Sequence, residues 1–115
     1  MPYLKIQSNK LFSSEDQQSI LLEFSQLLSK ELGKPEKYIM TSFAPQQEMT
    51  FGGSSEPLVF LQLKSIGLPN TQTKNLSEKL CQAVQQIMNI APERTYIEFR
   101  DAPRAFWGWN STTFE

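Results

Sequence analysis

The chain has 115 residues and a formal net charge of −1, from 11 Lys and Arg and 12 Asp and Glu. This length suits one compact domain, residues 1–115, with a modest core. Because no basic stripe is present, we expect no nucleic-acid partner, and no stretch is long and apolar enough to cross a membrane.

The residue types that are scarce limit the chemistry. Histidine is absent and Cys81 is the single cysteine. Ser-His and Cys-His nucleophile systems are therefore excluded, as are an internal disulfide and a CxxC redox pair. Cys81 lies among helix-patterned apolar residues, which is typical of a buried, inert thiol. Acid–base chemistry must use carboxylates, lysine, tyrosine or the chain terminus.

The chain opens with Met1-Pro2, and apolar and polar residues then alternate up to Ser8. This is the period of a half-buried strand over residues 2–8, and proline is tolerated at a strand's first residue. If Met1 is removed, Pro2 becomes a free secondary amine, which no other residue type offers at a chain end. The alternative interpretation is an ordinary strand that follows methionine.

A helix is predicted next. Ser14 stands three residues before Gln17, which is a capping-box spacing. Gly33 and Pro35 are typical of a helix end, so the helix should stop near Leu32. Its apolar stripe contains Ile20, Leu21, Phe24, Leu27, Leu28 and Leu32.

The middle of the chain contains two expected strands, over residues 38–44 and 58–63, separated by a loop over 45–57 that includes Gly52-Gly53. The second of these strands, LVFLQL, is almost continuously apolar. Such a run is expected of a strand that is buried on both faces.

The second half repeats the first in pattern. A helix is predicted over residues 73–89, ended by Pro92, and a strand over 95–99, followed by an aromatic tail that suits a small strand or turn. The order indicates two βαβ units, and hence an α+β fold with a four-stranded mixed sheet and two helices on one face. Another subunit would be the simplest cover for the bare second face.

Six separated segments carry a resemblance to a known family. They are residues 1–2 (MP), 33–39 (GKPEKYI), 51–57 (FGGSSEP), 65–67 (SIG), 92–97 (PERTYI) and 108–114 (GWNSTTF). In this order, and over the whole chain, they resemble the macrophage migration inhibitory factor family within the tautomerase superfamily, which also contains D-dopachrome tautomerase.

This resemblance implies a homotrimer whose three sheets enclose a central barrel, with an active site at each subunit interface. The implied activity is keto–enol tautomerisation of phenylpyruvate-like acids and dopachrome derivatives, without metal or organic cofactor. In that mechanism Pro2, freed by loss of Met1, is the catalytic base.

A terminal amine suits this role for a physical reason. A general base works best when its pKa lies near the working pH, and an α-amino group starts at a pKa of about 8. Burial and a neighbouring positive charge lower that pKa further. Lys34 is the candidate for this charge and for binding a substrate carboxylate. The alternative for Lys34 is a solvated loop lysine.

The resemblance extends to further residues of the site. It implies that Ile66 offers its backbone to the ligand, and that Tyr96 comes from the neighbouring subunit. For Trp109 and Phe114 the alternative role is packing at the subunit interface. The residues implied to bind substrate or to line the pocket are Tyr3, Tyr38, Ser65, Ile66, Tyr96, Trp109 and Phe114.

Three departures from mammalian members matter. Glu98 stands where they have asparagine; its charge near Pro2 would raise the pKa of the proline and oppose Lys34, unless Glu98 faces solvent or pairs with an arginine. Trp107 replaces an aliphatic residue and would narrow the pocket. Leu58 and Leu61 replace two cysteines, so the thiol oxidoreductase activity proposed for that pair cannot occur here.

The sequence leaves two other functions open. One is a cytokine mimic or interaction protein that contacts a host receptor, although residues 45–48 and 12–13 lack the aspartate and the arginine of the mammalian loops. The other is a metabolic isomerase with an unrelated substrate. We expect a cytoplasmic location because no signal-peptide pattern is found; the resemblance leaves export without a signal peptide open.

Overall fold

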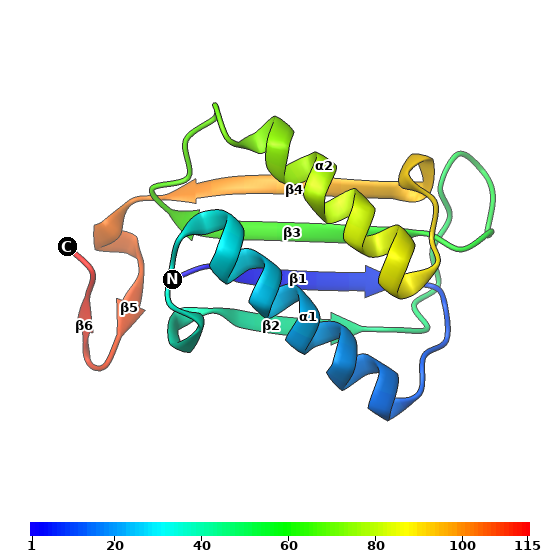
Figure 1. Ribbon diagram of the computed structural model, residues 1–115, viewed down its shortest axis with the longest axis horizontal. Helices are drawn as coiled ribbons and strands as arrows, with labels where there is room; N and C mark the ends of the chain where they lie inside the picture. Colours follow the sequence, from blue (N-terminus) through cyan, green and yellow to red (C-terminus); the bar gives the residue numbers. More distant parts are fainter.

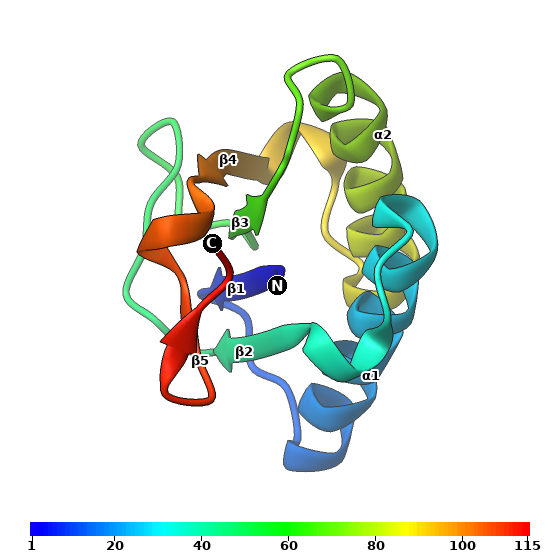
Figure 2. The same ribbon diagram turned by 90° about the vertical axis from the view of Figure 1, so that its left-hand side faces the viewer.

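The computed structural model describes all residues, 1–115, and arranges four strands in the order β2-β1-β3-β4 (Figure 1). Strand β1 (Tyr3–Ser8) is parallel to β2 (Met40–Ala44) and antiparallel to β3 (Val59–Ile66), and β3 is parallel to β4 (Thr95–Ala102). Helices α1 (Ser14–Leu32) and α2 (Thr73–Ala83) cover the same face of the sheet (Figure 2). The predicted α+β fold with a mixed sheet and two helices on one face is confirmed.

Helix α1 begins one residue earlier than the capping box predicts. The cap is Ser13, whose hydroxyl accepts a hydrogen bond from the Asp16 amide at 3.1 Å, so the expected role of Ser14 is wrong. The side chain of Gln17 donates instead to the Phe12 carbonyl at 2.9 Å. The end of the helix is as predicted, because Gly33 takes a left-handed conformation with φ of 64°.

The second helical segment changes character before it ends. The α-helix stops at Ala83, a π-helical turn follows over Val84–Met88, and Asn89 then takes the left-handed conformation. Lys10 from the opposite end of the chain donates its ammonium to the Met88 carbonyl at 2.7 Å. This contact satisfies one of the carbonyls that a helix end leaves free.

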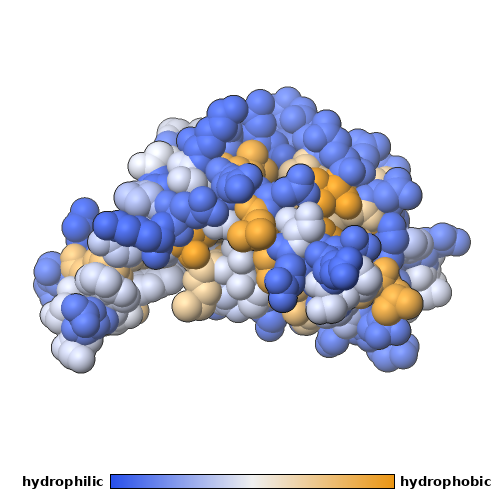
Figure 3. All heavy atoms as spheres, turned by 60° about the horizontal axis from the view of Figure 1, so that its bottom comes forward, coloured by the Kyte–Doolittle hydropathy of each residue, from blue (hydrophilic) through white to orange (hydrophobic).

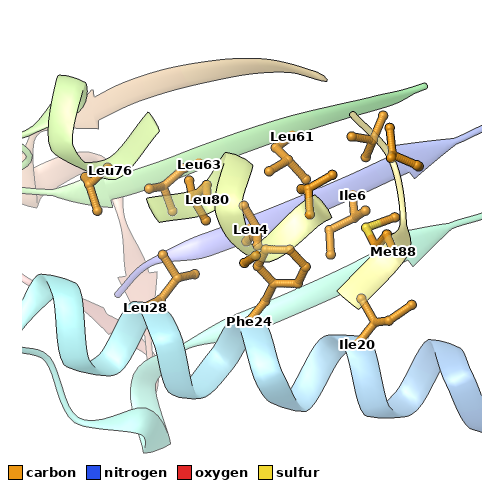
Figure 4. Close-up of a cluster of buried hydrophobic side chains, with 14 of the residues drawn as sticks. Leu4, Ile6, Ile20, Phe24, Leu28, Leu61, Leu63, Leu76, Leu80 and Met88 are labelled. Carbon is orange, nitrogen blue, oxygen red and sulfur yellow. The ribbon is translucent and has the colours of Figure 1, made fainter. Parts of the chain in front are cut away.

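The core lies between the helices and the sheet (Figure 4). Phe24 and Leu28 of α1 point toward Leu4 of β1, and Leu61 and Leu63 of β3 extend the same layer. Each of these five side chains is fully buried. Removing so much apolar surface from water is the main term that stabilises a domain of this size.

The other face of the sheet is not covered by helices. In β3, Val59, Leu61 and Leu63 are buried, whereas Phe60 and Gln62 are partly exposed. The second face is therefore open in the single chain, and its burial against another subunit stays a prediction. The apolar run predicted the strand, but its alternate side chains face the open side of the sheet.

The C-terminal segment folds into a short hairpin of β5 (Gly108–Trp109) and β6 (Thr112–Thr113). It lies at the end of the sheet where the chain begins, on the side away from the helices (Figure 2). The aromatic tail predicted as a small strand or turn is therefore a hairpin.

The surface view in Figure 3 is mostly hydrophilic, with hydrophobic residues in small separate groups. Neither helix is long and apolar enough to pass through a lipid bilayer.

Candidate active site

Most of the predicted site residues lie at one end of the sheet, where β1 and β2 begin and β3 and β4 end. Tyr3 pairs with Met40 of β2 and with Lys64 of β3, and Ser65 pairs with Asp101 near the end of β4. The strand directions therefore bring four distant parts of the sequence together at this end of the sheet. The C-terminal hairpin reaches the same end (Figure 1).

A cleft with two adjoining hollows lies at this end of the sheet. Both hollows are lined by Met1, Tyr38 and Phe114. One hollow, which we call the cationic hollow, has a volume of about 470 Å³ and contains Lys34 and Arg104. The other, the aromatic hollow, has a volume of about 320 Å³. Its further lining residues include Pro2, Tyr3, Met40, Trp107 and Trp109.

Pro2 is held rigidly at the start of β1. The residue is buried, and its carbonyl accepts a hydrogen bond from the Met40 amide at 3.0 Å. Met1, the residue before it, carries an amine whose pKa is lowered first by burial and then by the positive charge of Lys34. An amine at the start of this chain therefore has a lowered pKa and favours its neutral form, which can accept a proton.

Lys34 is positioned by the turn that ends α1. Its backbone amide donates to the Ser29 carbonyl at 3.2 Å, and the Ser29 hydroxyl donates to the Lys34 carbonyl at 2.6 Å. The ammonium donates to the Ser65 hydroxyl at 3.1 Å and to the Ile66 carbonyl. The Ile66 carbonyl therefore already has a partner, while one of the three ammonium hydrogens stays free for a ligand.

Two charged residues that the sequence interpretation missed line the cationic hollow beside Lys34. The pKa of Lys34 is lowered mainly by burial and next by the positive charge of Arg104, and the negative charge of Asp101 opposes both effects. Their positions in the sequence could have indicated this. Asp101 is the last residue but one of β4, and Arg104 lies two residues beyond the end of that strand. The end of a strand parallel to β3 must lie beside Ile66.

An aromatic cluster forms the boundary between the hollows. Tyr38 meets Trp109 edge-to-face with ring centroids 5.6 Å apart, and it meets Phe114 at 6.5 Å. Trp109 and Phe114 are stacked at 5.8 Å. Trp107 ties the hairpin to the chain end, since its carbonyl accepts from the Phe114 amide at 3.2 Å. These rings offer a flat apolar surface to an aromatic ligand.

Tyr96 and Glu98 line neither hollow of the cleft. Both lie on β4 on the open face of the sheet, where Tyr96 is 64% exposed. The Glu98 carboxylate accepts from the Gln62 amide group at 2.9 Å and lies 3.6 Å from the Arg100 guanidinium. The pKa of Glu98 is lowered, mainly by the Gln62 hydrogen bond, with Arg100 and Lys64 adding to the effect.

Tyr96 is held by a loop that Arg94 binds. The Arg94 guanidinium donates to the carbonyls of Phe51, Ser54 and Glu56 at 2.7, 3.1 and 2.8 Å. It also lies over the Phe51 ring at 5.2 Å, and that ring packs against Tyr96 with centroids 4.4 Å apart. Arg94 therefore fixes Phe51, and Phe51 restricts the Tyr96 ring.

The cleft contains the groups needed for proton transfer on an acid. A basic amine at the chain start, a cation with a free donor and a wall of aromatic rings lie together. No group of three or more Cys, Asp or Glu side chains is arranged to hold a metal ion. Cys81, which is half-buried on α2, has its pKa raised mainly by burial, so it favours the unreactive thiol form.

Comparisons with known proteins all identify the same family. The family model described as "Macrophage migration inhibitory factor (MIF)" matches residues 1–115. The macrophage migration inhibitory factor of Meriones unguiculatus is 37% identical over 115 residues, covering 99% of both chains. The protein of the same name from Rattus norvegicus is 39% identical over 98 residues, covering 84% of this chain and 85% of the relative.

Solved structures show the same similarity in three dimensions. The macrophage migration inhibitory factor homologue from Prochlorococcus marinus superposes with a TM-score of 0.92 at 41% identity, covering 98% of this chain and 99% of the homologue. The factor from Trichinella spiralis superposes with a TM-score of 0.88 at 29% identity, covering 96% and 98%.

Proposed function

Because the chain belongs to the macrophage migration inhibitory factor family of the tautomerase superfamily, we propose that it is a cofactor-free keto–enol tautomerase acting on small aromatic 2-keto acids. The observation that carries the proposal is the position of Pro2. Pro2 is buried at the start of β1, in a cleft where the amine of the preceding residue, Met1, already has a lowered pKa.

Pro2 acts as the base once Met1 is removed. Its secondary amine takes a proton from the carbon next to the keto group, and the electron pair of that C–H bond moves to form the enolate. The keto oxygen, which gains the negative charge, is protonated by the medium, and the enol leaves. In the opposite direction the same nitrogen returns the proton to carbon.

Lys34 and the aromatic cluster orient the substrate. The free ammonium hydrogen of Lys34 binds the substrate carboxylate, and the ring enters the aromatic hollow beside Tyr38 and Trp109. This places the carbon between the two groups near Pro2. Holding the reacting carbon against the base supplies part of the rate enhancement.

The active form in this proposal is a homotrimer. Strands β2 and β4 end the sheet and have no further partner, and an unpaired edge is a ready template for another chain. Met40, Tyr96, Phe106 and Trp109 are large apolar residues that are at least 52% exposed in the single chain. A neighbouring subunit would cover them and would bring its Tyr96 and Glu98 toward the cleft.

The test is the rate of enol–keto conversion of hydroxyphenylpyruvate by the wild type and by Pro2→Gly, with loss of Met1 checked by intact mass. We expect the variant to lose about a hundredfold or more in rate, which is typical of losing a general base. Pro69→Gly, an exposed proline outside the cleft, is the matched control and should keep its activity. Equal rates for wild type and Pro2→Gly would refute the proposal.

A second candidate, a cytokine-like interaction protein, is favoured by the names of the relatives, which are migration inhibitory factors. It would contact a receptor through its surface and would not need proton transfer. Binding to a receptor by a protein whose Pro2 amine has been chemically blocked would support this candidate. Loss of binding on blocking would count against it.

A further inference from the structure

Arg104 differs from the other charged side chains of the cleft because its guanidinium has no hydrogen-bond partner within the chain. It lies in a short helical turn, Arg104–Phe106, directly after β4, and it lines the cationic hollow. Its side chain makes no hydrogen bond or ion pair within the chain; the one ion pair of the structure joins Arg100 to Glu98. A guanidinium offers five N–H donors in a planar fork that matches a carboxylate.

Lys34 contrasts with Arg104 in the same hollow. Two of the three ammonium hydrogens of Lys34 are bound to Ser65 and Ile66. Lys34 can thus hold one acid group through a single hydrogen bond and its charge. Lys34 and Arg104 line the same hollow, and the positive charge of Arg104 lowers the pKa of Lys34. A ligand with one negative group beside each cation would therefore reduce the repulsion between them.

We propose that Arg104 is a specificity-determining residue of this cleft and binds a second anionic group of the substrate. The preferred substrates are then aromatic 2-keto acids that carry two acidic groups, rather than simple phenylpyruvate-like monoacids. The proposal rests on the proposed function for the site of the reacting carbon and for the role of Lys34 at the first carboxylate.

Asp101 is the group that opposes this assignment, since its carboxylate also lines the cationic hollow. One of its oxygens is engaged, because it accepts a hydrogen bond from the Leu68 amide at 3.0 Å. The hollow therefore has two cationic side chains against one carboxylate, and one oxygen of that carboxylate is already bound to a backbone donor. A net positive hollow favours an anionic guest.

The test is equilibrium binding of two unreactive ligands that differ by one acid group. Phenylsuccinate is 3-phenylpropanoate with a second carboxylate on the carbon that bears the ring. Dissociation constants are measured by calorimetry at fixed ionic strength for the wild type and for Arg104→Gln, with each phenylsuccinate enantiomer tested separately. Lys79→Gln removes one positive charge from α2, outside the cleft, and is the matched control.

We expect the wild type and Lys79→Gln to bind one phenylsuccinate enantiomer at least about fivefold more tightly than 3-phenylpropanoate, as suits an added charge-assisted contact. Arg104→Gln should abolish this preference and leave 3-phenylpropanoate binding within about twofold of the wild type. Equal weakening of both ligands would mean that Arg104 binds the shared carboxylate, and no preference in the wild type would mean that no second anion site exists. Either result overturns the proposal.

Turnover of hydroxyphenylpyruvate, measured on the same wild-type sample, keeps the two proposals apart. Turnover without a phenylsuccinate preference would refute the role of Arg104 alone. A phenylsuccinate preference without turnover would refute the tautomerase function and keep Arg104 as an anion-binding residue.

Discussion

The pKa of the amine at the start of the chain is lowered by burial first and by Lys34 second. Pro2 is buried in the same cleft, so we expect both causes to act on its amine once Met1 is gone. A base works in its unprotonated form, so kcat/KM rises with pH through the pKa of the amine. A lower pKa therefore extends activity to lower pH.

Lys34→Gln should raise the pKa of the Pro2 amine, because the nearby positive charge is lost while a side-chain donor for Ser65 is kept. The acid limb of the pH profile of kcat/KM should move to higher pH, and kcat/KM should fall about tenfold at its plateau as the carboxylate contact is lost. Steady-state kinetics across pH measure both effects. Lys30→Gln, an exposed charge on α1, is the control; an acid limb that stays in place in Lys34→Gln would contradict the role of the charge.

The residues of the cleft differ in how far the sequence could predict them. Pro2, Lys34 and Tyr38 follow from the resemblance, and the structure places these three in one cleft. Arg104 was missed because the strand predicted over residues 95–99 ends too early, whereas β4 extends to Ala102 and ends beside the cleft. Its place depends on the parallel pairing of β3 and β4, which the sequence predicted only as a topology.

At the scale of elements, the loop between β2 and β3 is held by side-chain hydrogen bonds, from Asn9 on one side and from Arg94 on the other. Arg94 binds the carbonyls of Phe51, Ser54, Glu56 and Pro57, the last at 3.3 Å. A single half-buried guanidinium thus donates to four backbone carbonyls of a loop that lies outside the sheet. Two of them, the carbonyls of Phe51 and Ser54, also accept from each other's backbone amide at 3.1 and 3.0 Å. The Arg94 side chain also holds Phe51 against Tyr96.

Arg94→Ala should therefore lower the free energy of unfolding by about 2 kcal/mol, a net value for several charge-assisted hydrogen bonds to partly hydrated carbonyls. Urea unfolding at equal protein concentration measures the change, since assembly makes stability depend on concentration. Arg94→Lys keeps the charge but loses the planar fork, so it should recover only part of the stability. Full recovery by lysine would show that charge, rather than geometry, holds the loop.

Other elements show where local signals compete. Ser13 and Ser14 are both good caps, and the capping-box spacing favoured Ser14, yet Ser13 takes the role. Residues 38–39 fit the strand pattern, but Pro35 begins a short helical turn over Glu36–Tyr38 and β2 starts at Met40. Such boundaries depend on tertiary contacts that a local pattern does not contain.

At the scale of the whole molecule, the apolar run over residues 58–63 predicts a strand that is buried on both faces. In the single chain its second face is partly open, with Phe60 and Gln62 beside Tyr96 and Glu98 of β4. The sequence pattern and the open face agree if a second subunit provides the missing cover. Tyr96 and Glu98, which line neither hollow of their own chain, would then serve the cleft of a neighbour.

Subunit mixing tests this arrangement directly. Pro2→Gly lacks the base and Tyr96→Ala lacks the ring offered to the neighbouring cleft, so each homotrimer should have low tautomerase activity. If Pro2 and Tyr96 of one site come from different chains, an equal mixture refolded together contains sites with both native residues, and about a quarter of the wild-type activity per site should return. If both residues act within one chain, every site keeps one defect and no activity returns. Mixing the folded proteins without refolding is the control, and light scattering on the wild type should give the mass of three chains.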